Sequence, residues 1–486
     1  MKCSVISHSY QGFCQLRLET DHYLCPMSEI QLPIDFEVQM QSLLGNEEFE
    51  KFKAAIDRNP KTSIRLNPAK SPSLSWPSHP IPWSENGYFL DERPSFTLDP
   101  VIHAGGYYVQ EASSMFIEHV LHSLNIPKGI YLDLAAAPGG KSTLLSTYLG
   151  NEGLLVANEV IQSRAQILKE NIIKWGLGNT LVTNNDPDHF SPLEGFFDLV
   201  LVDAPCSGEG MFRKDPQARE EWSMDHVTLC ALRQKRIMDQ AGALVKGGGY
   251  LIYSTCTFNE QENEDMIRFL TEEFAFEPVR IPFEKAWGIE ETDVDTEDGK
   301  FFGYRFFPHL VEGEGFFLTI LKRPDSASSQ EPGRIKDYKH AVLKSVSEKD
   351  GEALEEELGF DGTGKYYTLN DSYFRIQRNY YRYFEKLSQV LSLRYFGVEL
   401  GKKQKNEWIP SHEWALSILP KNNFSSLDLA QEQALEYLRK NDFQIEDLLL
   451  GWVLIKYQGL ALGWVKNLGN RVNNYYPKEW RIRING

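Results

Sequence analysis

The sequence predicts an α/β protein with a parallel β-sheet covered by helices on both faces. Between residues 129 and 254, short apolar runs alternate with longer segments in which apolar residues recur at helical spacing. Alternation of apolar strands with helices is typical of a parallel sheet that is buried on both sides. A glycine-containing loop follows the first of these strands, and a cysteine lies at the end of each of the last two. Ligands of α/β folds bind at this edge of the sheet, so we expect the functional site there.

The chain ahead of this region is expected to contain both helix and strand. Apolar residues recur at helical spacing up to Ile56, and Pro60 lies beyond them. Further on, Glu111 and the serines after it suit the first turn of another helix. The expected elements are a helix over residues 34–56, a short strand within 62–68, a Pro- and Ser-rich break over 71–82, and a helix that opens at 110–115 and runs to about 124.

The central region is expected to alternate strand and helix. The expected strands cover residues 129–134, 154–158, 180–183, 198–202 and 250–254, and the expected helices cover 142–148, 162–175 and 227–244. Two more strand-like runs, 303–307 and 315–321, flank a short connection and predict a closing antiparallel hairpin. After it, the polar stretch from Pro324 to Gly333 is typical of a linker.

Composition excludes several classes of protein. The net charge of −17 argues against a wholly basic nucleic-acid-binding protein. Six cysteines without a C-x-x-C pair favour neither a disulfide framework nor a zinc ribbon, so we expect no metal and a reduced, cytoplasmic protein. No apolar stretch is long enough for a membrane span, and the first residues contain no apolar segment typical of a signal peptide.

Charge is unevenly distributed along the chain. Residues 284–300 and 348–361 are strongly acidic. Two basic groups lie elsewhere and consist of Arg375, Arg378, Arg382, Lys402, Lys403 and Lys405, and of Lys466, Arg471, Lys478, Arg481 and Arg483. Such separation predicts one face for a polyanion and other faces that keep the protein in solution. The tyrosine-rich stretch 375–394 fits this face and equally fits an amphipathic helix that faces the core.

The loop after the first strand predicts a nucleotide-like cofactor. Small residues let the backbone approach a ligand closely, and the loop consists of Ala135, Ala136, Ala137, Pro138, Gly139, Gly140 and Lys141. Pro138 departs from the G-x-G-x-x-G loop of dinucleotide sites, which favours S-adenosylmethionine over NAD. Glu159 ends the second strand, where a carboxylate can accept from both ribose hydroxyls. Asp186 follows the third strand and can accept from the adenine amino group.

Two cysteines differ from the others by position. Cys206 and Cys256 both lie at strand ends, whereas Cys230 has the setting of a small buried hydrophobe. A thiol has a use beside a methyl donor, because carbon 5 of a pyrimidine is a weak nucleophile until a thiolate adds to carbon 6. Nearby positive charge favours the thiolate, and Lys141, Arg213 and Lys214 are the candidates. Addition also needs a proton or hydrogen bond at N3 of the base, which Asp203 can supply if burial raises its pKa.

These motifs resemble the Sun-domain family of RNA cytosine-5 methyltransferases. The matching segments are residues 108–114, 135–141, 203–208 with 213–216, and 253–257 with Glu260, Glu262 and Asn263. The resemblance implies a Rossmann-like class I methyltransferase core with S-adenosylmethionine as cofactor. It implies that Cys256 is the nucleophile and that Cys206 helps release the methylated base. It also places the cofactor contacts at Ala135 to Lys141, Glu159, Asp186 and Asp203. Cytosine-5 methyltransferases of DNA use the Pro-Cys cysteine instead, so these two roles rest on the resemblance and not on spacing.

The end of the chain resembles the PUA-like domain of bacterial 16S ribosomal RNA methyltransferases of the RsmF/YebU type. The resemblance rests on residues 463–466, 470–471 and 474–477 and implies a target in 16S ribosomal RNA or the small subunit. Basic residues interleaved with aromatic ones can hold phosphates and stack bases. The expected RNA contacts are Lys141, Arg213, Lys214, Lys466 and Arg471. Transfer RNA as substrate, or a ribosome assembly factor without catalysis, are the alternatives. We expect a monomer with no membrane association.

The expected domain organisation follows from these motifs. Residues 1–26 are interpreted as an extension or a mis-assigned start, because Met27 can also begin the chain. The remaining parts are an N-terminal RNA-binding or family-specific α/β domain over 27–115, the methyltransferase domain over 116–323, a linker and connecting region over 324–395, and a PUA-like, β-rich RNA-binding domain over 396–486.

Overall fold

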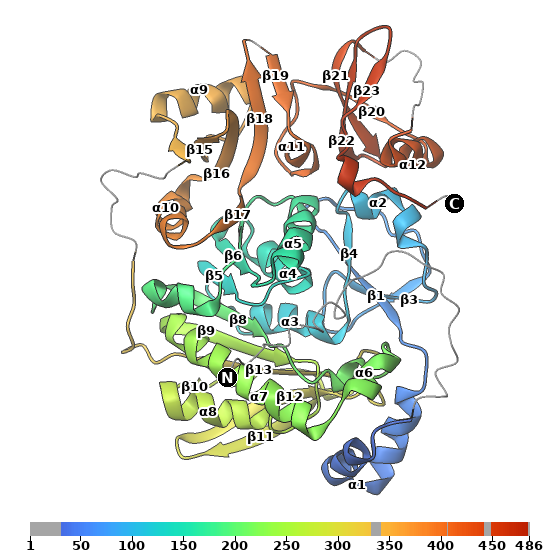
Figure 1. Cartoon of the computed structure of the whole chain (residues 1–486), viewed down its shortest axis with the longest axis vertical. Helices are drawn as coiled ribbons and strands as arrows, with labels where there is room; N and C mark the ends of the chain where they lie inside the picture. The colour runs from blue at the N-terminus through green and yellow to red at the C-terminus, as the bar shows by residue number, and fades with distance from the viewer. Residues whose placement is uncertain (1–30, 332–341, 406, 442–448, 485–486) are drawn as a thin grey trace, which may run out of the picture.

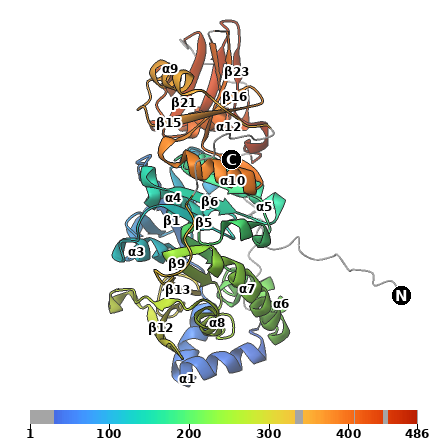
Figure 2. The same cartoon turned by 90° about the vertical axis from the view of Figure 1, so that its left-hand side faces the viewer.

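The computed structural model describes residues 31–331, 342–405, 407–441 and 449–484. The predictions for residues 1–26 and for the end of the linker, 332–333, lie outside the described residues. Within these residues the structure contains four β-sheets. The molecule is elongated, with α1 (Ile34–Ile56) at one end and the two C-terminal sheets at the other (Figures 1 and 2).

The N-terminal part contains a four-stranded antiparallel sheet in the order β2-β3-β1-β4. Its strands are β1 (Thr62–Leu66), β2 (Ser78–Pro80), β3 (Gly87–Leu90) and β4 (Tyr107–Val109), and the short helix α2 (Pro100–His103) precedes β4. The predicted helix over 34–56 and strand within 62–68 are confirmed. Helix α1 packs away from this sheet, and its buried Phe36 and Phe52 contact Phe212, Trp222 and Phe258. The helix therefore supports the two loops that follow the cysteines.

The central sheet has ten strands in the order β11-β12-β13-β9-β8-β5-β6-β7-β17, with β10 paired to β13. Strands β5 to β9 are parallel, and the strands outside them are antiparallel to their neighbours. The strands are β5 (Ile130–Asp133), β6 (Leu154–Asn158), β7 (Thr180–Thr183), β8 (Phe197–Asp203), β9 (Val245–Thr255), β10 (Glu277–Pro278), β11 (Glu290–Thr296), β12 (Gly299–Phe306), β13 (Phe316–Lys322) and β17 (Leu393–Phe396). Every residue of β5, β6 and β7 is buried, as a sheet covered on both faces requires.

Helices cover both faces of this sheet (Figure 2). They are α3 (Phe116–Ser123), α4 (Gly140–Leu149), α5 (Gln162–Trp175), α6 (Pro216–Glu221), α7 (Met224–Leu244) and α8 (Glu264–Phe274). Helix α5 has the predicted bounds. Helix α7 begins three residues before the predicted start, because Ser223 accepts a hydrogen bond from the backbone of His226 and caps it. The predicted hairpin is confirmed as the antiparallel pair β12 and β13.

One predicted helix start was wrong. Helix α3 begins at Phe116, after a 3-10 turn over Ser113–Met115, and not at 110–115. The carboxylate of Glu111 accepts hydrogen bonds from the backbone of Ser113 and Ser114, so it caps the turn as expected of a first-turn acid. The same carboxylate also accepts from the backbone of Glu314, which ties this turn to the loop before β13.

The C-terminal part contains two sheets. The first has five strands, β14 (Lys344–Ser345), β15 (Gly364–Leu369), β16 (Ser372–Gln377), β18 (Val398–Gln404) and β19 (Glu407–Pro410), with helices α9 (Glu348–Leu358), α10 (Tyr381–Val390) and α11 (His412–Leu416). The second has four, β20 (Ser425–Asp428), β21 (Gly451–Tyr457), β22 (Leu460–Asn467) and β23 (Val472–Asn474), with helix α12 (Gln431–Arg439). The predicted boundary between the connecting region and the PUA-like domain lies at residue 396. The five-stranded sheet spans this position, because β14, β15 and β16 precede it and β18 and β19 follow it.

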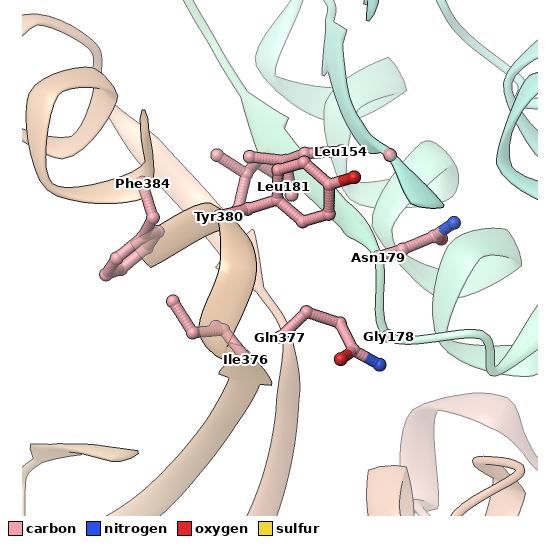
Figure 3. A pocket seen from close by; sticks show the side chains of 10 residues that line it. Leu154, Gly178, Asn179, Leu181, Ile376, Gln377, Tyr380 and Phe384 are labelled. Carbon is pink, nitrogen blue, oxygen red and sulfur yellow. The ribbon is translucent and has the colours of Figure 1, made fainter. Parts of the chain in front are cut away.

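The stretch 375–394 turns inward. Its first residue, Arg375, is buried and pairs with Glu355 at 2.9 Å, and Phe384 and Leu387 of α10 lie in the hydrophobic core. The core-facing interpretation therefore holds for this helix. Around it, Ile376, Tyr380 and Phe384 pack against strands β6 and β7 of the central sheet at Leu154 and Leu181 (Figure 3). The cavity left there has a volume of about 10 Å³, so the joint is closely packed.

No helix within the described part of the chain is long and apolar enough to cross a membrane. Over the same residues, no group of three or more His, Cys, Asp and Glu side chains could hold a metal ion.

Candidate active site

The two cysteines at strand ends lie side by side. Strands β8 and β9 are parallel neighbours, and Asp203 is level with Ser254. Cys206 follows the first strand and Cys256 the second, so the loops after the strands bring the thiols together, with their Sγ atoms 3.2 Å apart. Both side chains are half-buried, which leaves one side of the pair open to a ligand. Cys230, by contrast, is buried in α7 as expected.

The pairing of the thiols affects their protonation. The thiol hydrogen bond to Cys256 raises the pKa of Cys206 well above its usual value, and burial adds to this shift. Cys206 therefore keeps its proton, and its thiol can donate to the Sγ atom of Cys256.

An ion pair lies beside the thiols. Lys141 Nζ lies 2.8 Å from Asp203 Oδ2, and the hydroxyl of Ser254 donates to Asp203 Oδ1 at 2.9 Å. Burial lowers the pKa of Lys141, but the Asp203 carboxylate outweighs it and the net shift is upward. Lys141 therefore carries its charge in the site. Asp203 was expected to supply a proton or hydrogen bond at N3 if burial raises its pKa, and the structure gives this carboxylate a cationic partner.

The glycine-containing loop joins β5 to α4 and is held by α5. The side chain of Arg164 donates to the carbonyl oxygen of Ala137 at 3.0 Å, and that of Asn171 donates to Pro138 at 2.8 Å. Gly139 has a φ of +116°, which side chains rarely adopt, and a Cβ there would lie 3.2 Å from Leu168 Cδ1. The loop is thus a preformed cradle, and no pattern in the sequence indicates the two side chains of α5 that hold it.

Carboxylates follow neighbouring strands around this cradle. Glu159 is buried after β6 and accepts from the backbone of Ile161. Asp133 ends β5, and its Oδ2 accepts from Ser142 at 2.6 Å while its buried Oδ1 has no partner among the described residues. Burial raises the pKa of Asp133 to about 7. These side chains lie where the sequence analysis expected cofactor contacts, and Asp133 was missed.

Asp186 is more exposed than the other carboxylates and already has partners. Its Oδ1 accepts from the backbone of Asp188 at 3.2 Å and lies 3.3 Å from Arg236 of α7. The Arg236 side chain is itself two-thirds exposed, so it can move away when a ligand approaches.

The residues expected to contact RNA differ in exposure. Arg213 is buried and pairs with Glu314, with Nε 2.9 Å from Oε2, so its guanidinium is already engaged within the protein. Lys214 approaches the same carboxylate at 3.6 Å and is partly exposed. In the four-stranded C-terminal sheet, Lys466 of β22 pairs at 2.6 Å with Glu407, which belongs to β19 of the five-stranded sheet. Arg471 is exposed. Lys141 lies in the site itself. Arg213 could not be distinguished from a surface cation by sequence, because its partner is 101 positions away.

Comparisons with known proteins identify the family. Three family models match the chain: 16S rRNA methyltransferase RsmB/F over residues 123–322, the N-terminal domain of 16S rRNA methyltransferase RsmF over 32–112, and the methyltransferase RsmF PUA domain over 424–482.

Relatives match over nearly the whole length. Ribosomal RNA small subunit methyltransferase F of Aliivibrio fischeri (strain MJ11) is 32% identical over 471 residues, which cover 92% of this chain and 97% of the relative. The protein of the same name from Shewanella sp. (strain MR-4) is 31% identical and covers 90% and 95%. Among solved structures, the crystal structure of PH0851 has a TM-score of 0.52 and 25% identity over 60% of this chain and 66% of that one. The chain therefore belongs to the ribosomal RNA small subunit methyltransferase F family.

Proposed function

We propose that the protein transfers a methyl group from S-adenosylmethionine to carbon 5 of a cytosine in 16S ribosomal RNA, through a covalent adduct with Cys256. The observation that carries this proposal is the contact of the two thiols beside the Lys141–Asp203 pair at the ligand-binding edge of the sheet. A thiol is needed to activate carbon 5 of a pyrimidine, and most other methyl transfers have no use for one.

The residues of the cradle fit S-adenosylmethionine. Small residues let the backbone of Ala135 to Gly140 approach the cofactor closely, and the conformation of Gly139 disfavours a Cβ. Asp133 Oδ1 has no partner among the described residues, so it can accept a further hydrogen bond. Glu159 is placed for the ribose hydroxyls and Asp186 for the adenine amino group, once Arg236 moves aside. When bound, the cofactor supplies a methyl group on a positively charged sulfur.

The chain's own residues activate the base. The Cys256 thiolate adds to carbon 6 of the cytosine, which places electron density on carbon 5 and on N3. N3 needs a donor, and a carboxylate only accepts, so we infer that the proton comes from the Lys141–Asp203 pair. Asp203 orients the base and Lys141 provides the positive charge. The flipped base leaves its stack at a cost of roughly a few kcal/mol.

Release of the methylated cytosine requires a proton acceptor that removes the proton from carbon 5. Cys206 holds its own proton at the start because the hydrogen bond to Cys256 raises its pKa. Once Cys256 is bonded to carbon 6, that hydrogen bond and the neighbouring thiolate charge are gone, so the pKa of Cys206 falls. Cys206 can then lose its proton to solvent, take the proton of carbon 5, and allow the bond between carbon 6 and Cys256 to break. Bond formation by Cys256 thus prepares Cys206 to act as the proton acceptor.

The substrate assignment rests on the relatives and on the C-terminal sheets. The relatives are named for the RNA of the small ribosomal subunit, and the PUA domain matches over residues 424–482. RNA is the substrate class in every case, and 16S ribosomal RNA is the specific proposal. Acting as a monomer in the cytoplasm of a bacterium, the enzyme would meet this RNA either free or in small subunits.

Methylation assays with three RNAs test the proposal. Purified protein and labelled S-adenosylmethionine are incubated with small subunits, with free 16S ribosomal RNA and with transfer RNA, all from a strain without the gene. We expect incorporation into one of the two ribosomal substrates, at cytosines that bisulfite sequencing then maps. Incorporation into transfer RNA alone would contradict the target, and cofactor binding without incorporation into any RNA would contradict the enzymatic role.

A further inference from the structure

Two buried glutamates cross-brace the loops that carry the thiols. Glu209 follows Cys206 in the chain, yet its Oε2 accepts from the backbone of Phe258 at 2.9 Å, in the loop of Cys256. Glu262 follows Cys256, yet its Oε2 accepts from the backbone of Ser207 at 2.9 Å, in the loop of Cys206. Neither side chain is exposed. Each glutamate thus fixes the loop of the other cysteine.

A side chain of α7 also holds the Cys206 loop, together with Glu262. The side chain of Gln234 donates to Glu262 Oε2 at 2.8 Å and to the carbonyl oxygen of Pro205 at 3.1 Å. The backbone is therefore held at Pro205 and at Ser207, the residues on either side of Cys206. Holding both neighbours of a residue fixes where its side chain points.

The proposed function uses the two thiols at different steps, so the two braces serve different steps. On the basis of that function, we propose that Glu262 is a positioning residue for release, because it aims Cys206 at carbon 5, and that Glu209 positions Cys256 for attack. Loss of the Glu262 brace then leaves attack and methylation possible but slows the removal of the carbon 5 proton. The covalent RNA adduct accumulates.

The hydrogen bonds of the two carboxylates differ in a way that allows a sharp test. Glu262 Oε1 is buried without a partner among the described residues, so an amide nitrogen can replace it without meeting another donor. In Glu209, both oxygens accept from N–H groups, since Oε1 accepts from Gln39 at 3.3 Å and from Trp222 at 3.1 Å. Glutamine therefore fits at 262, whereas at 209 its amide group opposes either the two donors at Oε1 or the Phe258 donor at Oε2.

The experiment measures adduct formation and adduct release separately. Each variant is mixed with substrate RNA and S-adenosylmethionine, and the adduct is followed on denaturing gels over time. We expect Glu262→Ala to form the adduct at close to the wild-type rate and to release it at least about tenfold more slowly, because the backbone beside Cys206 loses its hydrogen-bond acceptor. Glu262→Gln should release at nearly the wild-type rate. Glu209→Gln should form the adduct slowly and accumulate none.

Controls separate this inference from the proposed function. Cys206→Ala must trap the adduct, since without that result it is the mechanism that fails and not the brace. Thermal unfolding and cofactor affinity show that each variant is folded. The inference is overturned if Glu262→Ala slows formation and release equally, if Glu262→Gln behaves as Glu262→Ala does, or if Glu209→Gln accumulates the adduct.

Discussion

The Sγ atoms of Cys206 and Cys256 lie 3.2 Å apart, although 50 positions separate the two residues in the chain. Each cysteine follows one of two parallel neighbouring strands, so the sheet itself sets their approach. The hydrogen bond between them raises the pKa of Cys206, and the proposed reaction uses the two sulfurs at different steps.

Alanine variants of the two cysteines should therefore fail at different steps. Cys256→Ala removes the nucleophile and should abolish 5-methylcytosine formation, measured by mass spectrometry of digested RNA. Cys206→Ala should trap a covalent complex of protein and RNA that resists denaturation. Cys230→Ala, which changes a buried thiol of α7, is the control and should keep activity. Full activity of Cys256→Ala would contradict the assignment of the nucleophile.

The conformation of Gly139 should limit cofactor binding. Gly139→Ala forces a side chain into a left-handed backbone at a cost of about 1–2 kcal/mol and brings its Cβ to 3.2 Å from Leu168. We expect weaker binding of S-adenosylmethionine by calorimetry. Gly150→Ala is the matched control, because Gly150 also has a positive φ but lies at the far end of α4 with no atom within 4 Å of a Cβ. Equal loss of affinity in both variants would contradict a role for the loop.

Much of the site could be predicted because it depends on local sequence. An apolar strand followed by a glycine loop or a cysteine is easy to identify in a sequence. In a parallel sheet the carboxyl ends of such strands lie at the same edge, so their residues are expected to lie together. This is why the sequence predicts that Lys141, Asp203, Cys206 and Cys256 lie at one edge of the sheet, where the structure brings them together. Glu209 and Asp133 lie in the same segments, but nothing in the sequence indicates that a given acid is buried and braces a loop.

The rest depends on contacts between distant segments. The partner of Arg213 is Glu314, and no local pattern connects them. The five-stranded C-terminal sheet was missed for a similar reason, because its strands are short, carry many polar residues and pair across helices. Antiparallel strands with one exposed face have weaker sequence patterns than the fully buried strands of the central sheet.

Arg213 should stabilise the fold and not bind RNA. Arg213→Met removes the guanidinium that pairs with the buried Glu314 carboxylate. Because a buried charge then loses its partner, the free energy of unfolding should fall by about 3–5 kcal/mol. Lys214→Met is the matched control, since Lys214 approaches the same carboxylate at 3.6 Å but is partly exposed, and it should change stability little. Urea unfolding measures both. Weaker RNA binding by Arg213→Met at unchanged stability would contradict this account.

Lys466 and Arg471 should contact RNA phosphates. Replacing either with alanine should weaken RNA binding and reduce the dependence of affinity on salt by about one counterion. Glu407→Gln is the informative counterpart, because it removes the carboxylate that holds Lys466 at 2.6 Å and should strengthen RNA binding. Binding titrations at several salt concentrations test this. Unchanged salt dependence in both alanine variants would place the RNA elsewhere.

His412 should make the stability of the protein depend on pH. Its ring packs against Tyr476 and Trp480, and both ring nitrogens are buried without a partner among the described residues. Burial lowers the pKa of His412 to about 3, and the charges of Lys174, Lys440 and Lys70 add to this effect.

The direction of the effect follows from proton binding. In the unfolded chain His412 has a pKa near the ordinary value of 6.5, so below that pH the unfolded state binds more protons than the folded state. The stability that depends on a neutral His412 is complete above about pH 6.5 and is lost as the pH falls toward about 3. At pH 5 the loss should be about 2 kcal/mol.

His412→Phe keeps a ring in the same place and removes the titration. The free energy of unfolding of the wild type, measured in urea, should fall relative to that of His412→Phe between pH 7 and pH 5. The difference between the two proteins isolates His412 from other groups such as His103, whose pKa burial lowers to about 4. A difference that stays constant over this range would mean that the ring can be protonated within the folded protein.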